Sequence, residues 1–176
     1  MPCETKVQLL FSALTTQSAN IAEEGRSLAA VMIRRVITAE FSEFFPKLSA
    51  EQQASFKSDL LVVLQQEPSR TVRKKLADLV AELARSLIDD EGNNMWPEFL
   101  KFLFELASSA NPDMKEAALR IFAAVPAVFG NQVRNTLLVF FASIYSHSET
   151  SKINLANLLL GNFRRRSTSR SLRTCS

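Results

Sequence analysis

Apolar residues recur at helical spacing along most of this chain, and one pattern of them occurs twice. The segments Val72–Ala84 and Met114–Pro126 place apolar residues in the same slots, 42 residues apart. A weaker version of the pattern, at Leu28–Met32, lies 48 residues upstream of Leu76. Periods of this size are typical of paired-helix repeats of the HEAT and armadillo type. Such proteins hold partners on an extended surface, so the pattern favours binding over catalysis.

Helix-start and helix-stop residues divide the chain into a succession of predicted helices. Ser49 with Gln52 forms a capping-box pattern, and Pro68 stops the helix that follows it. Asn111 is expected to cap a helix whose first residue is Pro112. The expected helices cover residues 6–14, 23–37, 49–66, 70–88, a segment beginning at Pro97, 111–125, 132–146 and, more weakly, 153–160.

These elements predict an all-α fold, an α-solenoid of HEAT-type antiparallel helix pairs about three units long. Residues 1–132 are expected to form the repeats, 133–162 further and divergent helices, and 163–176 a basic, disordered tail. With 47% hydrophobic and 22% charged residues, the 176-residue chain is suited to an ordered core. Only 4 glycines and 6 prolines agree with a helical class.

Several sequence features point to an intracellular protein outside the membrane. The longest wholly apolar runs fall far short of the roughly 18 residues that cross a bilayer. The N-terminal segment, MPCETKVQLLFSAL, has no basic region before its apolar stretch, so no secretory signal is expected. Cys3 and Cys175 stand alone at opposite ends, and no Asn-x-Ser/Thr acceptor occurs. Both absences favour a reducing compartment.

The net charge of +3 depends on the C-terminal tail, where five arginines lie within the last thirteen residues. Without them, 16 basic side chains face 18 acidic ones. The body of the chain is therefore not a general nucleic-acid binder, and only weak contact through the tail is expected. The tail itself is compatible with a nuclear-localisation element, a phosphorylation target, an RNA-contacting segment or a plain disordered terminus.

Candidate catalytic and metal-binding residues are few, and no cofactor is expected. The single histidine, His147, is favoured as a solvated loop residue, with a hydrolase that uses it as the alternative. Asp89, Gly92 and Glu98 fit three positions of a calcium loop, but Leu87 at the first ligand position offers no oxygen. No zinc spacing and no glycine-rich phosphate loop are found. The chain is therefore predicted not to be an enzyme.

An acidic turn followed by the only tryptophan is the next candidate site. Asp89, Asp90, Glu91 and Trp96 are candidate contacts for a partner, because an acidic turn attracts basic groups and tryptophan is enriched at binding hot spots. The alternatives are a solvated turn between helices and a tryptophan that packs into the core.

The stretch ELARSLIDDEGNNMWPEFLKFLFE, from Glu82 to Glu105, resembles a known family, as do Ala22–Arg35 before it and Glu116–Gln132 after it. Together they are similar to the N-terminal HEAT repeats of the importin 5, or karyopherin beta 3, branch of the importin-beta superfamily. The similarity covers Lys6 to Gln132 and fades afterwards; the family's first helices are missing and full receptors are several times longer.

The resemblance implies a nuclear import receptor that works in the cytoplasm and the nucleus. Its implied partners are Ran-GTP, cargo proteins with basic nuclear-localisation segments, and nucleoporins. Two alternatives stay open: a HEAT-repeat scaffold or adaptor outside nuclear transport, and a truncated product with little activity.

A row of charged residues is the predicted partner-binding surface. In such solenoids the second helix of each unit lines the concave side, and shifts by 48 and 42 residues align polar slots of successive units. The aligned slots hold Arg26, Arg34, Lys74, Asp78, Glu82, Glu116 and Arg120. Alternating charges of this kind suit a polar contact with a protein such as Ran. The alternative is that they only keep the solenoid soluble.

Overall fold

The computed structural model describes residues 3–15, 22–89 and 94–126. They form α1 (Cys3–Thr15), α2 (Glu23–Phe44), the short 3-10 helix η1 (Phe45–Lys47), α3 (Ala50–Gln66), α4 (Arg70–Ser86), α5 (Pro97–Ser108) and α6 (Pro112–Ala124). Every helix predicted within these ranges is present. The helices predicted over 132–146 and 153–160, the histidine and the basic tail lie outside the described residues.

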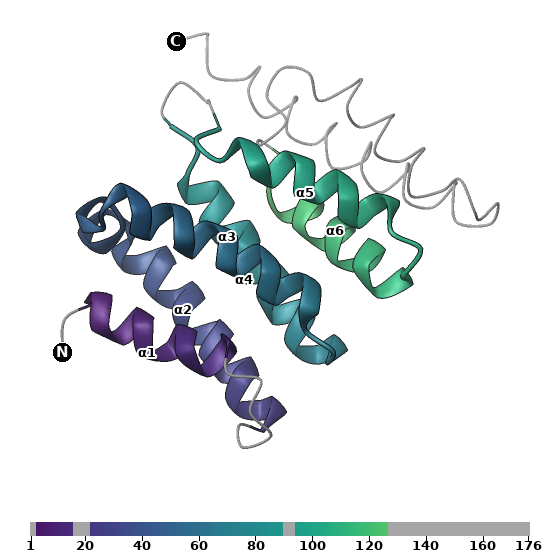
Figure 1. Ribbon diagram of the computed structural model, residues 1–176, viewed down its shortest axis with the longest axis horizontal. Coiled ribbons are helices and arrows are strands. Elements are labelled where there is room, and N and C mark those ends of the chain that lie inside the picture. Colours follow the sequence, from purple (N-terminus) through teal and green to yellow (C-terminus); the bar gives the residue numbers. More distant parts are fainter. Residues whose placement is uncertain (1–2, 16–21, 90–93, 127–176) are drawn as a thin grey trace, which may run out of the picture.

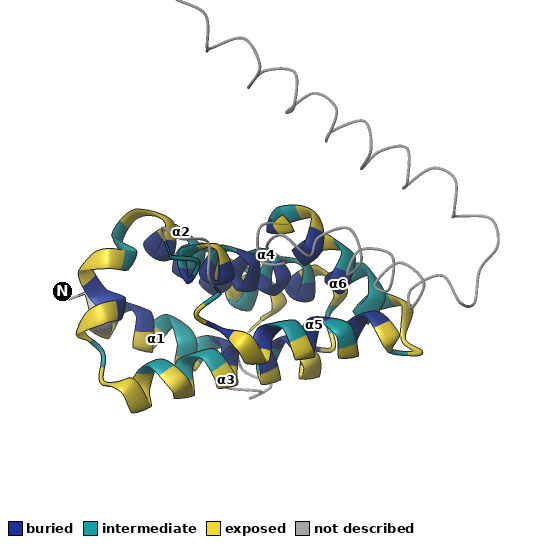
Figure 2. Ribbon diagram, turned by 90° about the horizontal axis from the view of Figure 1, so that it is seen from above, coloured by how far each residue is buried: buried dark blue, intermediate teal, exposed yellow. Residues whose placement is uncertain are grey.

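The six α-helices are arranged in two layers. Figure 2 shows α2, α4 and α6 in one layer, and α1, α3 and α5 in the other. We call these the second-helix layer and the first-helix layer. The pairs α1–α2, α3–α4 and α5–α6 stand side by side along the molecule (Figure 1). The predicted all-α stack of helix pairs is therefore confirmed.

The helix starts have the physical origin that the sequence indicates. Ser49 Oγ accepts a hydrogen bond from the Gln52 backbone N–H at 3.2 Å, and Gln52 Oε1 accepts one from the Ser49 N–H at 2.9 Å. This capping box satisfies two donors that α3 leaves unpaired. At α6, Asn111 Oδ1 accepts from the Asp113 N–H at 2.9 Å, and Pro112 occupies the first turn. Both predicted caps are confirmed.

The end of α2 differs from the prediction. The helix continues seven residues beyond Ile37 to Phe44, with a break in helical geometry at Glu40 (φ −132°, ψ 17°). Aromatic packing accounts for the extension: Phe41 stacks on Phe45 with ring centroids 4.8 Å apart, and Phe44 is buried. The apolar face of α2 therefore resumes after the arginines that interrupt the sequence pattern.

The core runs along α4, which lies between α2 and α6. Seven of its apolar residues are completely buried: Val72, Leu76, Ala77, Leu79, Val80, Leu83 and Ala84. The slots 42 residues later are also buried at Ala118, Ile121, Phe122 and Val125. The repeated apolar pattern thus marks the same buried face on α4 and α6. The weaker match on α2 does not mark a buried face, because Leu28 is 61% exposed.

Among the described residues, none of the helices combines the length and the apolar character that a membrane span requires.

Candidate partner-binding site

The seven charged residues predicted to form a partner surface all lie on α2, α4 and α6. The structure brings five of them into ion pairs between helices, Arg26 into a pair with Glu67 after the end of α3, and Glu82 into a pair within α4. We call these ion pairs the charge ladder. It consists of the seven predicted residues and five more that pair with them or lie beside them: Glu67, Arg70, Arg73, Arg85 and Asp113. It connects the three helices of the second-helix layer from side to side.

Asp78 on α4 stands at the centre of the ladder, between arginines of both neighbouring helices. Its two carboxylate oxygens accept from Arg120 Nε at 2.5 Å and from Arg120 Nη2 at 3.0 Å, a bidentate pair. Arg34 Nη1 lies 3.7 Å from Asp78 Oδ2. The hydrogen bond to Asp78 raises the pKa of Arg120 above its ordinary value. We call Arg34, Asp78 and Arg120 the Asp78 triad.

Glu116 on α6 forms a second node of the ladder. Its carboxylate pairs with Lys74 Nζ at 2.9 Å and with Arg70 Nη2 at 2.7 Å. Both hydrogen bonds lower the pKa of Glu116, and the one from Lys74 has the larger effect. The hydrogen bond between Arg70 and Glu116 also raises the pKa of Arg70. Asp113 lies beside this node, with an oxygen 3.3 Å from Arg73 Nη1. Several cations therefore hold the start of α6 against α4.

Glu67, at the end of α3, forms the most buried ion pair. Its side chain is only 4% exposed and that of its partner Arg26 is 19% exposed. The carboxylate accepts from Arg26 Nη2 at 3.1 Å and from the Ser69 backbone N–H at 2.9 Å. Its own backbone carbonyl accepts from Arg73. Burial of this kind makes the pair a structural joint between α2 and the α3–α4 turn.

Reasoning from the sequence missed five residues of the ladder: Glu67, Arg70, Arg73, Arg85 and Asp113. Two of them, Glu67 and Arg73, are buried. A usable signal was present. Slots that are equivalent by the 42-residue shift carry opposite charges, Lys74 against Glu116 and Asp78 against Arg120. Because equivalent slots lie next to one another in stacked helices, opposite charges there indicate pairing within the layer.

The acidic turn has a different outcome. Asp89 is half-buried, whereas Asp90 and Glu91 lie outside the described residues. Trp96 is 1% exposed and stacks on Phe99 with ring centroids 5.1 Å apart. In this structure its side chain is therefore part of the core rather than a surface available to a partner.

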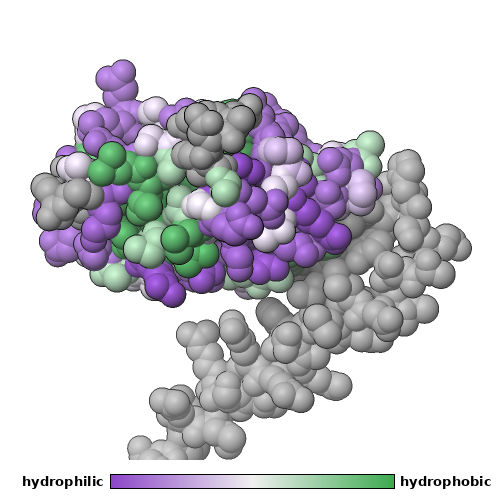
Figure 3. Space-filling model, turned by 90° about the horizontal axis from the view of Figure 1, so that it is seen from below, coloured by the Kyte–Doolittle hydropathy of each residue, from purple (hydrophilic) through white to green (hydrophobic). Residues whose placement is uncertain are grey.

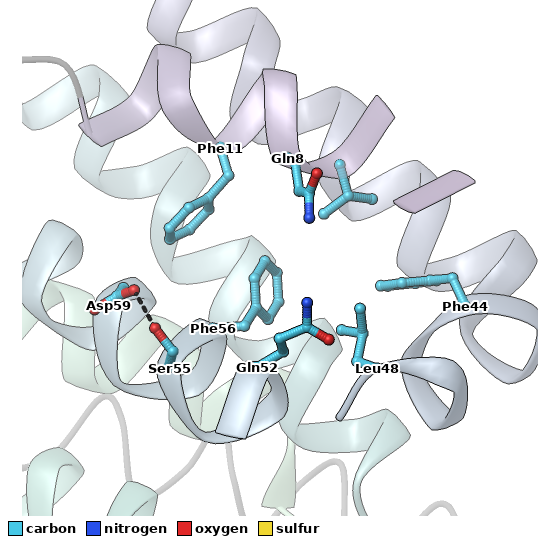
Figure 4. Close-up of a pocket in the computed structure, with 9 residues that line it drawn as sticks. Gln8, Phe11, Phe44, Leu48, Gln52, Ser55, Phe56 and Asp59 are labelled. Atoms are coloured by element: carbon cyan, nitrogen blue, oxygen red, sulfur yellow. Dashed lines mark hydrogen bonds between the residues drawn. The ribbon is translucent and has the colours of Figure 1, made fainter. Parts of the chain in front are cut away.

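A cavity of about 190 Å³ opens between α1 and α3 on the first-helix layer. Figure 3, which views the molecule from the side where α1 and α2 lie in Figure 1, shows apolar side chains gathered on one part of that side. Phe11 and Phe56 approach across the cavity at 5.1 Å between ring centroids, and the amides of Gln8 and Gln52 point toward one another from its two sides (Figure 4). Its lining offers apolar contact and amide hydrogen bonds. Asp59 accepts a hydrogen bond from Ser55 at 2.9 Å.

Among the described residues, no group of three or more histidine, cysteine, aspartate or glutamate side chains is placed to hold a metal ion.

Comparison with a family model gives one match, described as IPO5-like, TPR repeats, over residues 68–158. This segment is just over half of the chain, and it extends past Gln132, where the resemblance read from the sequence ends. The described part of the matched segment contains α4, α5 and α6.

Three curated relatives that the chain matches are much longer proteins. Importin subunit beta-3 of Saccharomyces cerevisiae is 26% identical over 92% of this chain and 15% of its own length. The probable importin-5 homolog of Dictyostelium discoideum is 26% identical over 66% of this chain and 10% of its own length. Importin-4 of Mus musculus is 32% identical over 66% of this chain and 10% of its own length. The chain thus spans no more than 15% of these relatives.

Two solved structures share the fold. A crystal structure of Kap121p bound to RanGTP matches with a TM-score of 0.56 and 24% identity, covering 90% of this chain and 16% of that one. Kap121p bound to the extreme C-terminus of the protein phosphatase Cdc14p matches with a TM-score of 0.55 and 23% identity, over the same shares. At these identities the likeness establishes the helical-repeat fold.

Proposed function

The chain belongs to the IPO5-like family of repeat proteins, and we propose that it acts in nuclear import by binding Ran-GTP and protein cargo. The observation that carries this proposal is the family match over residues 68–158, which includes two of the three described helices of the second-helix layer. The names of the curated relatives, all importins, support it. So does the fold shared with Kap121p, whose structures contain RanGTP in one case and a Cdc14p segment in the other.

The proposed mechanism is binding rather than catalysis. Stacked helix pairs present their second helices as one continuous surface, and a partner that spans several helices contacts all of them at once. The charge ladder holds α2, α4 and α6 in a fixed register, so this surface is organised before the partner arrives. Organisation in advance reduces the entropy lost on binding. A receptor of this kind works in both the cytoplasm and the nucleus, and nucleoporins are further proposed partners.

The test is the affinity of the purified chain for Ran loaded with a non-hydrolysable GTP analogue, compared with Ran loaded with GDP. We expect binding to the GTP form at least about tenfold tighter, a difference of about 1.4 kcal/mol. The same measurement on Asp78→Lys addresses the second-helix layer, with Lys101→Glu as the matched control. Lys101 lies on α5 in the opposite layer, with its side chain 83% exposed.

Equal affinity for the two nucleotide forms would refute the Ran proposal and favour a scaffold outside nuclear transport. A change of binding in the Asp78 variant but not in the Lys101 variant locates the contact on the second-helix layer. Far-UV circular dichroism of both variants is needed, because replacing the carboxylate of Asp78 by a cation also places a third positive charge beside Arg34 and Arg120.

A further inference from the structure

We infer that the Asp78 triad is a docking point for a carboxylate-bearing segment of a protein partner, which Arg34 and Arg120 bind from either side of Asp78. This inference rests on the proposed function, because it specifies the kind of surface that a partner presents to the second-helix layer. It concerns the chemistry of the contact, an acidic protein segment, and it predicts which individual side chains control it.

The first observation is an excess of positive charge in the charge ladder. Five carboxylates take part in it: Glu67, Asp78, Glu82, Asp113 and Glu116. Seven cations take part: Arg26, Arg34, Arg70, Arg73, Lys74, Arg85 and Arg120. The body of the chain without the C-terminal tail is mildly acidic. The ladder is thus locally cationic on an otherwise acidic body, which favours encounter with an acidic partner segment.

The second observation is the unequal sharing of Asp78. Arg120 occupies both carboxylate oxygens at hydrogen-bond distances of 2.5 and 3.0 Å, whereas Arg34 stays 3.7 Å away, beyond hydrogen-bond range. The Arg34 side chain is 42% exposed and that of Arg120 is 43% exposed, but Asp78 is only 19% exposed. Two guanidinium groups therefore face solvent around one recessed carboxylate.

The third observation concerns the other carboxylates of the ladder, each of which already has a cation. Glu82 is held by Arg85 Nη1 at 2.6 Å, and Arg85 also donates to the carbonyl of Ala124 at 2.9 Å. Glu116 is held by two cations at 2.9 Å or less. A cation from a partner would have to displace these residues. A carboxylate from a partner instead meets Arg34, whose guanidinium lies 3.7 Å from Asp78 and presents a planar set of N–H donors suited to bidentate binding.

The experiment uses the full chain and a fluorescein-labelled hexaglutamate peptide as probe, with binding followed by fluorescence anisotropy at about 50 and 200 mM salt. Arg34→Gln removes the guanidinium that is least committed to Asp78, and Arg35→Gln removes the exposed arginine next to it. We expect Arg34→Gln to weaken binding about five- to tenfold and Arg35→Gln to change it by less than about twofold. Because the C-terminal arginines also attract this probe, all variants are compared again in a chain with Arg164, Arg165 and Arg166 changed to glutamine.

Asp78→Asn supplies an outcome of opposite sign. It removes the carboxylate that competes for the two arginines, so the acidic probe should bind about threefold or more tightly, provided circular dichroism shows a folded chain. A labelled hexalysine peptide is the charge control. Equal effects of Arg34→Gln and Arg35→Gln, tighter binding of hexalysine than of hexaglutamate, or weaker hexaglutamate binding to a folded Asp78→Asn chain would each overturn the inference. The readout involves no Ran, so this failure is separate from failure of the Ran measurement.

Discussion

Replacing Glu67 by alanine tests whether the charge ladder contains a true structural joint. The side chain is 4% exposed and accepts hydrogen bonds from Arg26 and from the Ser69 backbone N–H. Its removal leaves the Arg26 guanidinium, itself 19% exposed, without its carboxylate. Breaking a buried ion pair from one side costs about 3–5 kcal/mol, and the partial exposure of Arg26 places this case near the lower end, about 3 kcal/mol.

The assay is chemical and thermal unfolding of the full chain at pH 7, followed by far-UV circular dichroism. For a chain of this length, about 3 kcal/mol lowers the melting temperature by about 6–12 °C and the urea midpoint by about 1 M or more. The matched control is Glu105→Ala on α5, whose side chain is 58% exposed and lies 3.9 Å from Lys101. An exposed pair of that kind contributes less than about 1 kcal/mol.

Glu67→Gln separates charge from shape. The amide keeps the size of the side chain and one acceptor for the Ser69 N–H, but it removes the negative charge that faces Arg26. We expect Glu67→Gln to lower the free energy of unfolding by less than Glu67→Ala does and by more than Glu105→Ala does. If Glu67→Ala destabilises the chain no more than Glu105→Ala does, the reasoning is refuted, because the carboxylate would then contribute no more than a surface charge.

Three further predictions follow from the described residues. Leu76→Ala, at a completely buried position of α4, should lower the free energy of unfolding by about 2–5 kcal/mol in urea titrations, and a loss below about 1 kcal/mol would contradict its central place. Because the pKa of Glu116 is lowered in the folded chain, its contribution to the free energy of unfolding is complete above the unfolded pKa of about 4.3 and disappears as pH falls through the folded pKa. The melting temperature should therefore fall less steeply from pH 7 to pH 3 in Glu116→Gln than in the parent chain. Parallel curves of melting temperature against pH would contradict this prediction. Trp96 is the sole tryptophan and is 1% exposed, so its emission should be blue-shifted and poorly quenched by iodide until unfolding, whereas efficient quenching of the folded chain would show that it is accessible.

Helix boundaries were predictable from the sequence wherever a local chemical signal exists. Ser49 with Gln52, and Asn111 with Pro112, act through hydrogen bonds within one turn, so the local sequence is sufficient. The end of α2 was not predictable in this way. There Phe44 and Phe45 are buried, and Phe45 packs on Phe56 of α3 with ring centroids 6.4 Å apart, a contact between helices that the local sequence does not specify.

The candidate site was predicted only in part. The 42-residue shift identified residues that share one layer, because successive units place equivalent slots on the same helix face. It did not identify their partners. Glu67 lies in a turn outside the repeated pattern, so no periodicity indicates that its carboxylate is buried beside Arg26.

The sequence by itself determined the class of fold, because apolar spacing and caps act over a few residues and the apolar pattern of Val72–Ala84 occurs again 42 residues later. Tertiary structure alone decided which charged side chains pair with one another. Whether Asp78 faces a partner or binds Arg34 and Arg120 depends on the lateral distance between stacked helices, which brings side chains 42 and 44 positions apart within 4 Å. Ion pairing depends on that distance and on burial, and neither is set by the order of residues along one helix.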